Sequence, residues 1–557
     1  MKFKGFFKFS LVIVFLFAIA NLNYATGQTE DAPQPGNPIE TIDIATRSPA
    51  DSPEIYEASL VIADSLKELG FDVTITPRPT HIHNTQTREE PWPFNIMLYS
   101  WGSRPERLDP NTFLFLPFHS SQAVSGGENR IGFENDEYDR IVDEQAKTMD
   151  INKRRPLVYK AQEILADEAV MCVMWYADTV IFYNKERFRG FVSIPGEGIG
   201  SEWSPMLVEP ITSDRTLRVA MLEEPDMLNP LAMTTTPEVA FGRNIFDRLV
   251  RIGPDGDPKA HMAESWNIIS DTVIDFTLRE GLKWHDGEPV TAEDVEFTFD
   301  YYKKWPVPFF KPWVDPIKKV TATGALTVRF ELNEPFAPLI GGTLAQLFII
   351  PKHIWKDVPE KVGLSHPDEW TDLSKAMIGS GPFKFEHWRR GEEILVSKHH
   401  GYFMEPKIDE MLFIVYGNND AVAGALEMNQ IDVHIVPPTL LPAEINQLRK
   451  MSHLEETTAP AIGFAYFLFN IRKPPFDDKA LRQALMYAVD YDLLIEAILE
   501  GRGTQGGPGK IITPANEAYY NPNIFVPSFN LSRARELLKE AGYRWDSRGQ
   551  IHYPEDK

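Results

Sequence analysis

The sequence predicts an α/β protein with more than one domain. Strand and helix patterns alternate in residues 39–75, where a strand from Ile39 to Ala45, a helix from Pro53 to Leu69 and a strand from Phe71 to Ile75 follow one another. The chain has 557 residues. About 530 would remain after removal of an N-terminal targeting segment, which is too many for one core and enough for two or three domains.

The composition is ordinary for a soluble globular protein, and its charge excludes one class of partner. Hydrophobic residues make up 43% and charged residues 24% of the chain, and the formal net charge is -24. Because nucleic acids and anionic membrane surfaces are bound by clustered Lys and Arg, we expect neither as a partner. The single cysteine, Cys172, excludes an intrachain disulfide and lies in the apolar run Val170–Trp175, where we expect it to be buried.

The N-terminus has the pattern of a secretory signal peptide over residues 1–27. Lysines precede an apolar run from Leu11 to Ala20 that is too short to span a membrane, and small residues follow it. An uncleaved anchor is the alternative. Since no cysteine follows the run, we expect no lipid attachment and a mature protein in a periplasm or outside the cell. Residues 28–38 are polar and rich in proline, which predicts a disordered leader.

A strand followed by a polar and aromatic loop marks the first candidate site. The expected strand runs from Asn95 to Ser100, and the loop from Trp101 to Phe113 contains charges of both signs and a proline turn. Because open α/β sheets bind ligands at the carboxyl ends of their strands, we interpret this loop as facing a ligand. A solvated loop is the alternative. Further patterns predict helices from Glu134 to Met149 and from Ile151 to Ala166 and a strand from Val170 to Tyr176.

The most informative pattern lies between Ala263 and Asp300. Asp275 to Leu278 alternates as in a half-buried strand, Asp286-Gly287 is a tight-turn dipeptide, and Thr291 is placed as the N-cap of a helix whose first turn is acidic. This segment of strand, turn and capped helix contains no catalytic group.

The same segment closely resembles the signature of the family 5 extracellular solute-binding proteins, the peptide-, oligopeptide- and nickel-binding receptors of ABC transporters. The resemblance implies an α/β, two-lobed periplasmic-binding-protein fold of type II, similar to cluster C, with an extra subdomain. It implies a receptor that captures a peptide-like ligand between its lobes and delivers it to an ABC transporter permease. We expect a monomer without catalytic activity or cofactor. An oligosaccharide is the alternative ligand, and a secreted hydrolase is the alternative of another class.

The family-like segments stand in an unusual order. Residues 39–178 resemble the C-terminal half of such receptors, yet they precede residues 216–469, which resemble the N-terminal half. A circular permutation explains this order, with the usual ends joined near residues 209–215 and new ends opened at a hairpin between Ile39–Ala45 and Gln550–Tyr553. Halves completed by a neighbouring chain are the alternative.

The resemblance also divides the chain into domains. It predicts a second lobe at residues 39–178, a return segment with the permutation linker at 179–215, a first lobe with the extra subdomain at 216–469, and a hinge crossing with the start of the second lobe at 470–557. We expect crossings between the lobes near Trp175–Asp178 and near Asn470–Ile471, where a few residues would absorb the rotation on closure.

Candidate ligand-binding residues follow from the same resemblance. In peptide-binding relatives an aspartate shortly after the tryptophan receives the α-amino group of the peptide, whereas this chain has Ser103-Arg104-Pro105-Glu106-Arg107 there. Glu106 or Asp109 could still accept a cation, and Arg104 suits a carboxylate. The candidates are Trp101, Arg104, Glu106, Asp109 and Asn111 from the second lobe and Leu228, Asn229, Asn244 and Phe246 from the first. Roles in the core or in a turn are the alternative for Trp101, Asp109, Leu228 and Phe246.

Other motifs lack residues that their chemistry needs. The glycine-rich run Gly501–Lys510 has a threonine at a glycine position of a phosphate-binding loop, and Ile511 stands where magnesium is bound, so we expect a mobile loop. Neither His81 with His83 nor the pair His399-His400 has a carboxylate-rich ligand pattern beside it, so we expect no metal site. The motifs of zinc peptidases and α/β-hydrolases are absent from the sequence.

Overall fold

The computed structural model describes residues 35–222, 224–436, 440 and 442–555. The expected signal peptide at residues 1–27 lies outside the described residues, as does most of the expected leader. The end of that leader differs from the prediction of disorder. Residues 36–38 are ordered and form hydrogen bonds with the last strand of the chain, at His552. Within the described residues, no helix is both long enough and apolar enough to cross a membrane.

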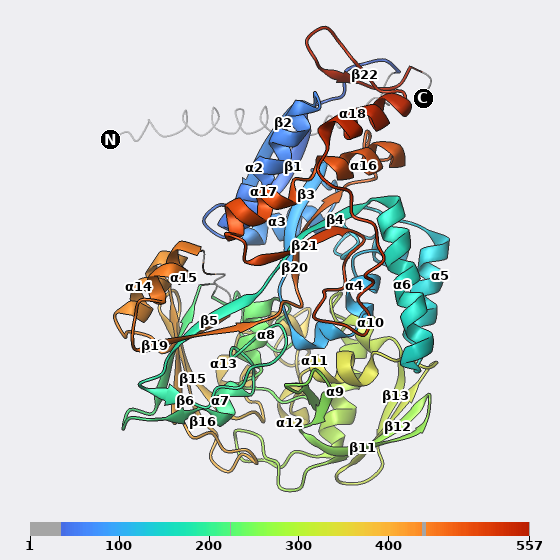
Figure 1. Cartoon of the computed structure of the whole chain (residues 1–557). Coiled ribbons are helices and arrows are strands. Elements are labelled where there is room, and N and C mark those ends of the chain that lie inside the picture. Colours follow the sequence, from blue (N-terminus) through green and yellow to red (C-terminus); the bar gives the residue numbers. More distant parts are fainter. Residues whose placement is uncertain (1–34, 223, 437–439, 441, 556–557) are drawn as a thin grey trace, which may run out of the picture.

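A six-stranded sheet forms the centre of the second lobe, at the top of Figure 1. The strands β1, β2 and β3 are mutually parallel, and the other three run antiparallel to their neighbours. Helix α2 (Pro53–Glu68) connects β1 to β2 and ends before Gly70, whose φ of +99° favours glycine. The predicted strand, helix and strand are therefore confirmed. In spatial order the strands are β2 (Val73–Arg78), β1 (Ile42–Arg47), β3 (Ile96–Trp101), β20 (Phe464–Phe469), β4 (Met171–Ala177) and β21 (Gly503–Pro508).

A seven-stranded sheet forms the first lobe, at the lower left of Figure 1. Its central strand β8 is parallel to β17 on one side and β18 on the other. One apolar cluster covers one face of the sheet, and a second, smaller cluster covers the other face around β8 and β5, while β15 and β16 have partly exposed residues on that second face. In spatial order the strands are β15 (Phe383–Arg389), β16 (Glu393–Lys398), β17 (Glu410–Val415), β8 (Thr216–Met221), β18 (Val433–Val436), β5 (Thr179–Asn184) and β19 (Leu454–Ala459).

The extra subdomain is a four-stranded antiparallel sheet packed against helix α9 (Ala292–Lys304). The Asp294 carboxylate accepts hydrogen bonds from the backbone N–H of Thr291 at 2.9 Å and from its hydroxyl at 3.0 Å, which closes the first turn of the helix. Gly287 has a φ of +96° in the predicted turn. The predicted strand, turn and capped helix are thus confirmed. The strands are β11 (Ala263–Ser270), β12 (Val273–Leu278), β14 (Thr327–Leu332) and β13 (Ile317–Ala322).

Shorter elements fill the connections. Among the described residues, the remaining α-helices are α3 (Thr80–Arg88), α4 (Asn111–Phe115), α5 (Asp136–Lys147), α6 (Ile151–Glu168), α7 (Ser204–Leu207), α8 (Thr236–Gly242), α10 (Lys311–Val314), α11 (Leu344–Gln346), α12 (Lys352–Trp355), α13 (Leu373–Ala376), α14 (Asn419–Glu427), α15 (Pro442–Leu448), α16 (Lys479–Leu485), α17 (Tyr491–Leu493) and α18 (Leu531–Glu540). Short strand pairs are β9 (Val250–Ile252) with β10 (Pro258–Ala260), β6 (Phe188–Arg189) with β7 (Glu209–Pro210), and β22 (Arg544–Trp545) with β23 (Ile551–His552).

The chain crosses between the two large sheets at two places. The first crossing lies at Asp178, between β4 of the second lobe and β5 of the first, where a crossing was predicted. The second lies at residues 460–463, between β19 and β20, and not near Asn470 as predicted. Asn470 follows β20 and is buried, and its side-chain amide donates to the carbonyl oxygen of Phe94 at 3.0 Å. The predicted boundary of the first lobe at residue 469 therefore moves back to residues 460–463.

The two described ends of the chain lie side by side on the second lobe. Pro38 and His552 form an antiparallel bridge, and the N–H of Ile39 donates to the carbonyl oxygen of Ile551 at 3.0 Å. The C-terminal end lies near β22 in Figure 1. The two segments predicted to form a hairpin, Ile39–Ala45 and Gln550–Tyr553, are in contact. The contact involves residues just before β1 and not β1 itself.

The glycine-rich run is part of a strand, which corrects the expectation of a mobile loop. Strand β21 pairs with β4 in the second-lobe sheet. A Cβ on Gly506 would lie 2.3 Å from the carbonyl oxygen of Val173, so glycine permits a backbone approach that a side chain would block. On the neighbouring strand Cys172 is fully buried, as predicted, and burial raises the pKa of its thiol to about 12.

Buried histidines make the stability of the fold dependent on pH. His434 on β18 is 2% exposed, and its Nε2 accepts a hydrogen bond from the N–H of Phe182 on β5 at 3.1 Å. Burial lowers the pKa of His434 to about 4, and burial together with the charge of Arg251 lowers the pKa of His261 to about 3. In an unfolded chain both pKa values would be about 6.5. The unfolded state therefore binds more protons below that pH, and stability falls as the pH drops from about 6.5 to about 4.

We predict that H434Q reduces this pH dependence. Glutamine keeps an acceptor for the Phe182 N–H but takes up no proton. The variant therefore loses the contribution of His434 to the pH dependence of the free energy of unfolding, which is at most about 1.4 kcal/mol per pH unit. Calorimetric melting temperatures at pH 7 and pH 5 should differ less for H434Q than for the parent. The control is H400Q, because the side chain of His400 is 81% exposed, and it should follow the parent. Equal differences in H434Q and the parent would contradict the prediction.

Candidate functional site

The loop after β3 is fixed to the second crossing between the lobes. Strand β3 ends at Trp101, which is paired with Phe464 of β20. The hydroxyl of Ser103 accepts hydrogen bonds from the N–H groups of Ile462 at 3.1 Å and Gly463 at 3.0 Å. A Cβ on Gly463 would lie 2.0 Å from the carbonyl oxygen of Trp101, so the two backbone segments approach as only glycine permits. The candidate loop therefore lies at the joint of the lobes.

A buried ion pair spans the boundary between the lobes. Glu106, in the short helix Pro105–Leu108 of the second lobe, accepts a hydrogen bond from Arg243 at 2.5 Å. Arg243 follows the last residue of α8 in the first lobe and also binds Glu197 at 2.5 Å. The side chains of Glu106 and Arg243 are each 2% exposed. Because such charges are costly to bury singly, each depends on the other being in place.

The charges at this boundary are strongly coupled. Burial would raise the pKa of Glu106, but the charges of Arg243 and Arg104 outweigh it and hold the value at about 2. Burial raises the pKa of Glu197, and Arg243 only partly offsets this effect. Burial lowers the pKa of Arg104, the charge of Glu106 opposes this shift, and the charge of Arg243 adds to it. Glu106 is therefore the carboxylate most firmly held in its charged form.

A second buried network continues from this boundary into the first lobe. Arg248 and Arg251 share the carboxylate of Glu202, and Arg251 also binds Asp247 at 3.0 Å. The same Asp247 carboxylate accepts a hydrogen bond from the hydroxyl of Tyr402 at 2.8 Å. All of these arginines and acids are buried. The network holds the segment after α8 rigidly under the ion pair.

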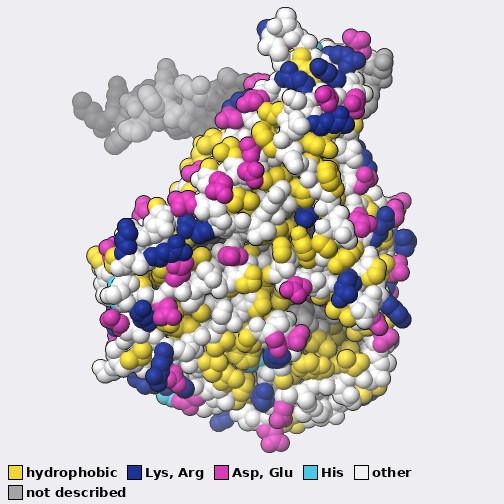
Figure 2. All heavy atoms as spheres, in the orientation of Figure 1, with side chains coloured by type: hydrophobic (Ala, Val, Ile, Leu, Met, Phe, Trp, Pro, Cys, Tyr) yellow, Lys and Arg dark blue, Asp and Glu magenta, His cyan; other side chains and the backbone are white. Residues whose placement is uncertain are grey.

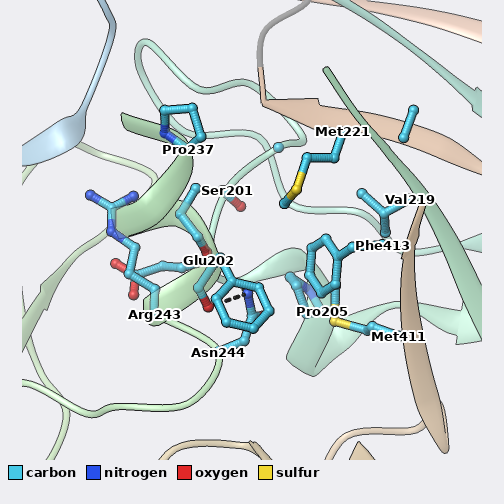
Figure 3. A pocket seen from close by; sticks show the side chains of 14 residues that line it. Ser201, Glu202, Pro205, Val219, Met221, Pro237, Arg243, Asn244, Met411 and Phe413 are labelled. Carbon is cyan, nitrogen blue, oxygen red and sulfur yellow. Dashed lines mark hydrogen bonds between the residues drawn. The ribbon is translucent and has the colours of Figure 1, made fainter. Parts of the chain in front are cut away.

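A small cavity lies beside Arg243. Its walls come from α8, from strands β8 and β17 and from residues 200–205, and its volume is about 20 Å³, which is room for about one water molecule. Figure 3 shows Met221, Met411 and Phe413 on the strand side and Arg243 and Pro237 on the helix side. Asn244, a predicted ligand-binding residue, lines this cavity and donates its side-chain amide to the carbonyl oxygen of Ala240. None of its lining residues belongs to the second lobe, so this cavity is not the space between the lobes.

The second-lobe candidates divide into two groups. Arg104 and Glu106 lie at the lobe boundary, whereas Asp109 binds Arg154 through two hydrogen bonds of 2.8 Å and so holds the loop to α6. Asn111 accepts a hydrogen bond from Gln145 at 2.6 Å. Trp101 is 9% exposed, with Arg107 over its ring at 4.7 Å and Phe113 against its edge. Three of these candidates are thus occupied by contacts within the lobe.

Most first-lobe candidates are also internal. Leu228 and Phe246 are fully buried in one apolar cluster of the first lobe. The side-chain amide of Asn229 donates to carbonyl oxygens of Pro367 at 2.9 Å and Trp370 at 3.1 Å, which joins the segment before α8 to residues 367–370. Ligand contact by these residues stays a prediction.

Arg243 and Glu197 were not predicted from the sequence. Arg243 stands one residue before the predicted Asn244, but its sequence neighbours give no sign that it is buried. Glu197 lies in a turn closed by a bridge between Ile194 and Gly198, within the predicted return segment. Arg243 meets Glu197 from 46 residues away and Glu106 from 137 residues away, and no local pattern encodes such contacts.

Two other features are separate from the lobe boundary. A groove of about 740 Å³ lies on the second lobe between α6, α16 and α18, and none of the predicted ligand-binding residues lines it.

Among the described residues, no three His, Cys, Asp or Glu side chains gather as a metal-ligand set. His83 is buried and stacks on Tyr99, and His399 contacts the carbonyl oxygen of Gly381 at 3.0 Å. On the face shown in Figure 2, basic and acidic side chains are interspersed.

We predict that E106Q destabilises the protein by about 3 kcal/mol, because it removes one partner of a buried ion pair. Urea unfolding at pH 7 measures this change, and X-ray scattering should show a larger radius of gyration as the lobes separate. The control is E456Q, whose partner Arg449 has a side chain 47% exposed; it should lower stability much less and leave the radius unchanged. Equal effects of the two substitutions would contradict a buried contact between the lobes.

Comparison with known proteins identifies relatives over part of the chain. The family model for bacterial extracellular solute-binding proteins, family 5 Middle, matches residues 257–556. The dipeptide-binding protein of Escherichia coli is 28% identical over 62% of this chain and 66% of its own length. The oligopeptide-binding protein AppA of Bacillus subtilis is 28% identical over 59% of each chain. The chain thus spans slightly less than two thirds of the lengths of these curated relatives.

A solved structure supports the fold. NikZ from Campylobacter jejuni, in complex with Ni(L-His), has a TM-score of 0.50 at 20% identity, covering 61% of this chain and 66% of that one. At this identity the likeness concerns the fold alone. The family model, in contrast, matches more than half of the chain. The protein therefore belongs to the family 5 bacterial extracellular solute-binding proteins.

Proposed function

We propose that this protein is a receptor that captures a peptide-like ligand between its two lobes and delivers it to an ABC transporter permease. The observation that carries the proposal is the family match over residues 257–556, together with relatives named for dipeptide and oligopeptide binding. Two sheets joined by two crossings support it, because such a joint permits the lobes to close around a ligand. Ligand contacts from both lobes exist together only in the closed form, so binding favours closure.

The family is extracytoplasmic, and we propose a secreted receptor that acts as a monomer in a periplasm or outside the cell. The pattern of residues 1–27 supports secretion. The receptor itself would make and break no bonds. Its second partner would be the permease, which recognises the closed form.

A peptide suits the site better than a sugar. An oligosaccharide site generally presents an exposed aromatic face, but Trp101 is covered by Arg107 and Phe113. The lobe boundary offers charged groups of both signs instead, in Arg104, Glu106 and Arg243. Peptides carry both charges and backbone amides, which match such groups.

We predict that mixed tripeptides raise the melting temperature of the mature protein, whereas neutral oligosaccharides do not. At a ligand concentration 100 times Kd the free energy of unfolding should rise by about 2.7 kcal/mol. Mass spectrometry of the recovered peptides is the control, because a receptor returns them uncleaved. Stabilisation by oligosaccharides alone would support the alternative ligand, and cleavage that a single carboxylate substitution abolishes would contradict the receptor function.

We propose further that the chain order is a circular permutation of the usual family order. The pairing of Pro38 with His552 supports this proposal, because it brings the described ends into contact. A Cβ on Gly36 would lie 3.7 Å from the Glu555 side chain, so the ends are close enough to join. The strands of both large sheets come from this chain, which also supports the proposal.

We predict that a chain rearranged to begin at residue 213, with Glu555 joined through a short glycine linker to Gly36 and ending at residue 212, folds and melts within a few degrees of the parent. The new ends would lie in the exposed turn before β8, where cutting is tolerated. The control rearrangement opens the chain inside β20, whose residues are all buried, and should not fold. The permutation would be contradicted if the first rearrangement failed to fold while the parent chain, extended after its C-terminus by the same glycine linker, kept its melting temperature.

A further inference from the structure

We propose that Arg104 binds an acidic group of the ligand. This inference rests on the proposed receptor function and names the ligand chemistry of the same site. The Arg104 side chain is 1% exposed, and its guanidinium lies 5.8 Å from the ring centroid of Phe309 in the extra subdomain. It extends from the loop after β3, so it lies where the second lobe meets the rest of the molecule.

Arg104 is buried without a hydrogen-bond acceptor for two of its donor atoms, Nε and Nη1. The nearest carboxylate oxygen, Oε1 of Glu106, is 3.8 Å from Nε, which is too far for a hydrogen bond. Other buried arginines, such as Arg243 and Arg248, also leave Nε without an acceptor, but each donates a hydrogen bond through another nitrogen, whereas Arg104 leaves two nitrogens without one. Arg104 is therefore poised for an acceptor that comes from outside the chain.

The surrounding acids use only some of their carboxylate oxygens in contacts within the chain. Glu106 and Glu197 each place one carboxylate oxygen on Arg243. Glu238 accepts hydrogen bonds from the backbone N–H groups of Thr234 and Thr235, both at 3.0 Å. The second carboxylate oxygens, Oε1 of Glu106 and Oε2 of Glu197, have no hydrogen-bond partner, and neither is hydrogen-bonded to Arg104, so the guanidinium is left open to an acceptor from a ligand.

The geometry fits a carboxylate next to an amide. The planar guanidinium of Arg104 can donate two hydrogen bonds to one carboxylate. Beside it, Oε1 of Glu106 is buried and has no hydrogen-bond partner, so it can accept an N–H from the ligand. A peptide end supplies both groups. Since the ligand's negative charge would neutralise Arg104 only when the lobes enclose it, the same contact favours closure.

Three tripeptide probes test the inference by calorimetric titration: Ala-Ala-Ala with a free C-terminus, its C-terminal amide, and the C-terminal amide of Ala-Glu-Ala. We expect the parent to bind at least one of the two acidic probes about tenfold more tightly than the neutral amide, which corresponds to one charged contact. R104M should reduce that preference to less than about twofold, and R104K should leave an intermediate preference, because lysine keeps the charge but not the planar fork. The surface control is R189M, whose side chain is 72% exposed in the parent, and it should bind like the parent.

Melting temperatures separate a ligand-binding role from a structural one. R104M should melt only slightly lower than the parent, because Glu106 keeps its ion pair with Arg243 and methionine fills similar space without unsatisfied donors. A large loss of stability in R104M would assign Arg104 to the fold and overturn the inference. So would equal binding of acidic and neutral probes by the parent, or an unchanged preference in R104M, and both results would leave the receptor function standing. If no peptide bound, the proposed function and this inference would both fall.

Discussion

The arrangement of the two lobes depends on the buried ion pair between Glu106 and Arg243. One partner is carried by the loop after β3 and the other by the end of α8, and both side chains are 2% exposed. Because either charge alone would be costly in this position, the end of the strand and the end of the helix are fixed relative to each other. The loop can reach Arg243 only because Ser103 holds it to the crossing at Ile462 and Gly463. The hydrogen bonds of Ser103 to the crossing and the ion pair of Glu106 with Arg243 therefore hold the same loop in place.

Local patterns predicted the elements well and the crossings only in part. The helical spacing and glycine stop of α2 and the capped start of α9 are local features, and both helices are found where expected. The error at Asn470 has a physical reason: β20 reads FAYFLF, and all six residues are buried. A strand buried on both faces has no alternation that would tell which sheet it joins. In β21 the glycines permit close backbone packing. A glycine-rich run is also typical of a mobile loop, so the sequence alone does not distinguish the two.

The sequence predicted the position of the candidate loop at the end of a strand, but not which residues its side chains contact. The loop after β3 carries Arg104 and Glu106 to the lobe boundary, where Glu106 contacts Arg243, and their contact with a ligand stays a prediction. Asp109 has the same local context, yet its charge is taken by Arg154 from α6, 45 residues away. Asn229 is likewise engaged with carbonyl groups of residues 367–370. Partners this remote leave no trace in a local pattern, so a polar residue in a loop cannot be assigned to ligand or to fold from its neighbours.

The position of the chain ends makes the proposed circular permutation compatible with the contacts at the lobe boundary. The bridge between Pro38 and His552 lies just before β1, and the N–H of Ile551 donates to the carbonyl oxygen of Gly70, just before β2. The ends thus gather where the parallel strands begin. The loop with Arg104 and Glu106 follows β3, where the parallel strands finish, so the sheet separates the ends from the site. Both crossings connect the same two sheets wherever the chain begins. Opening the chain at one edge of the sheet therefore leaves the charge contact and the joint at the other edge undisturbed.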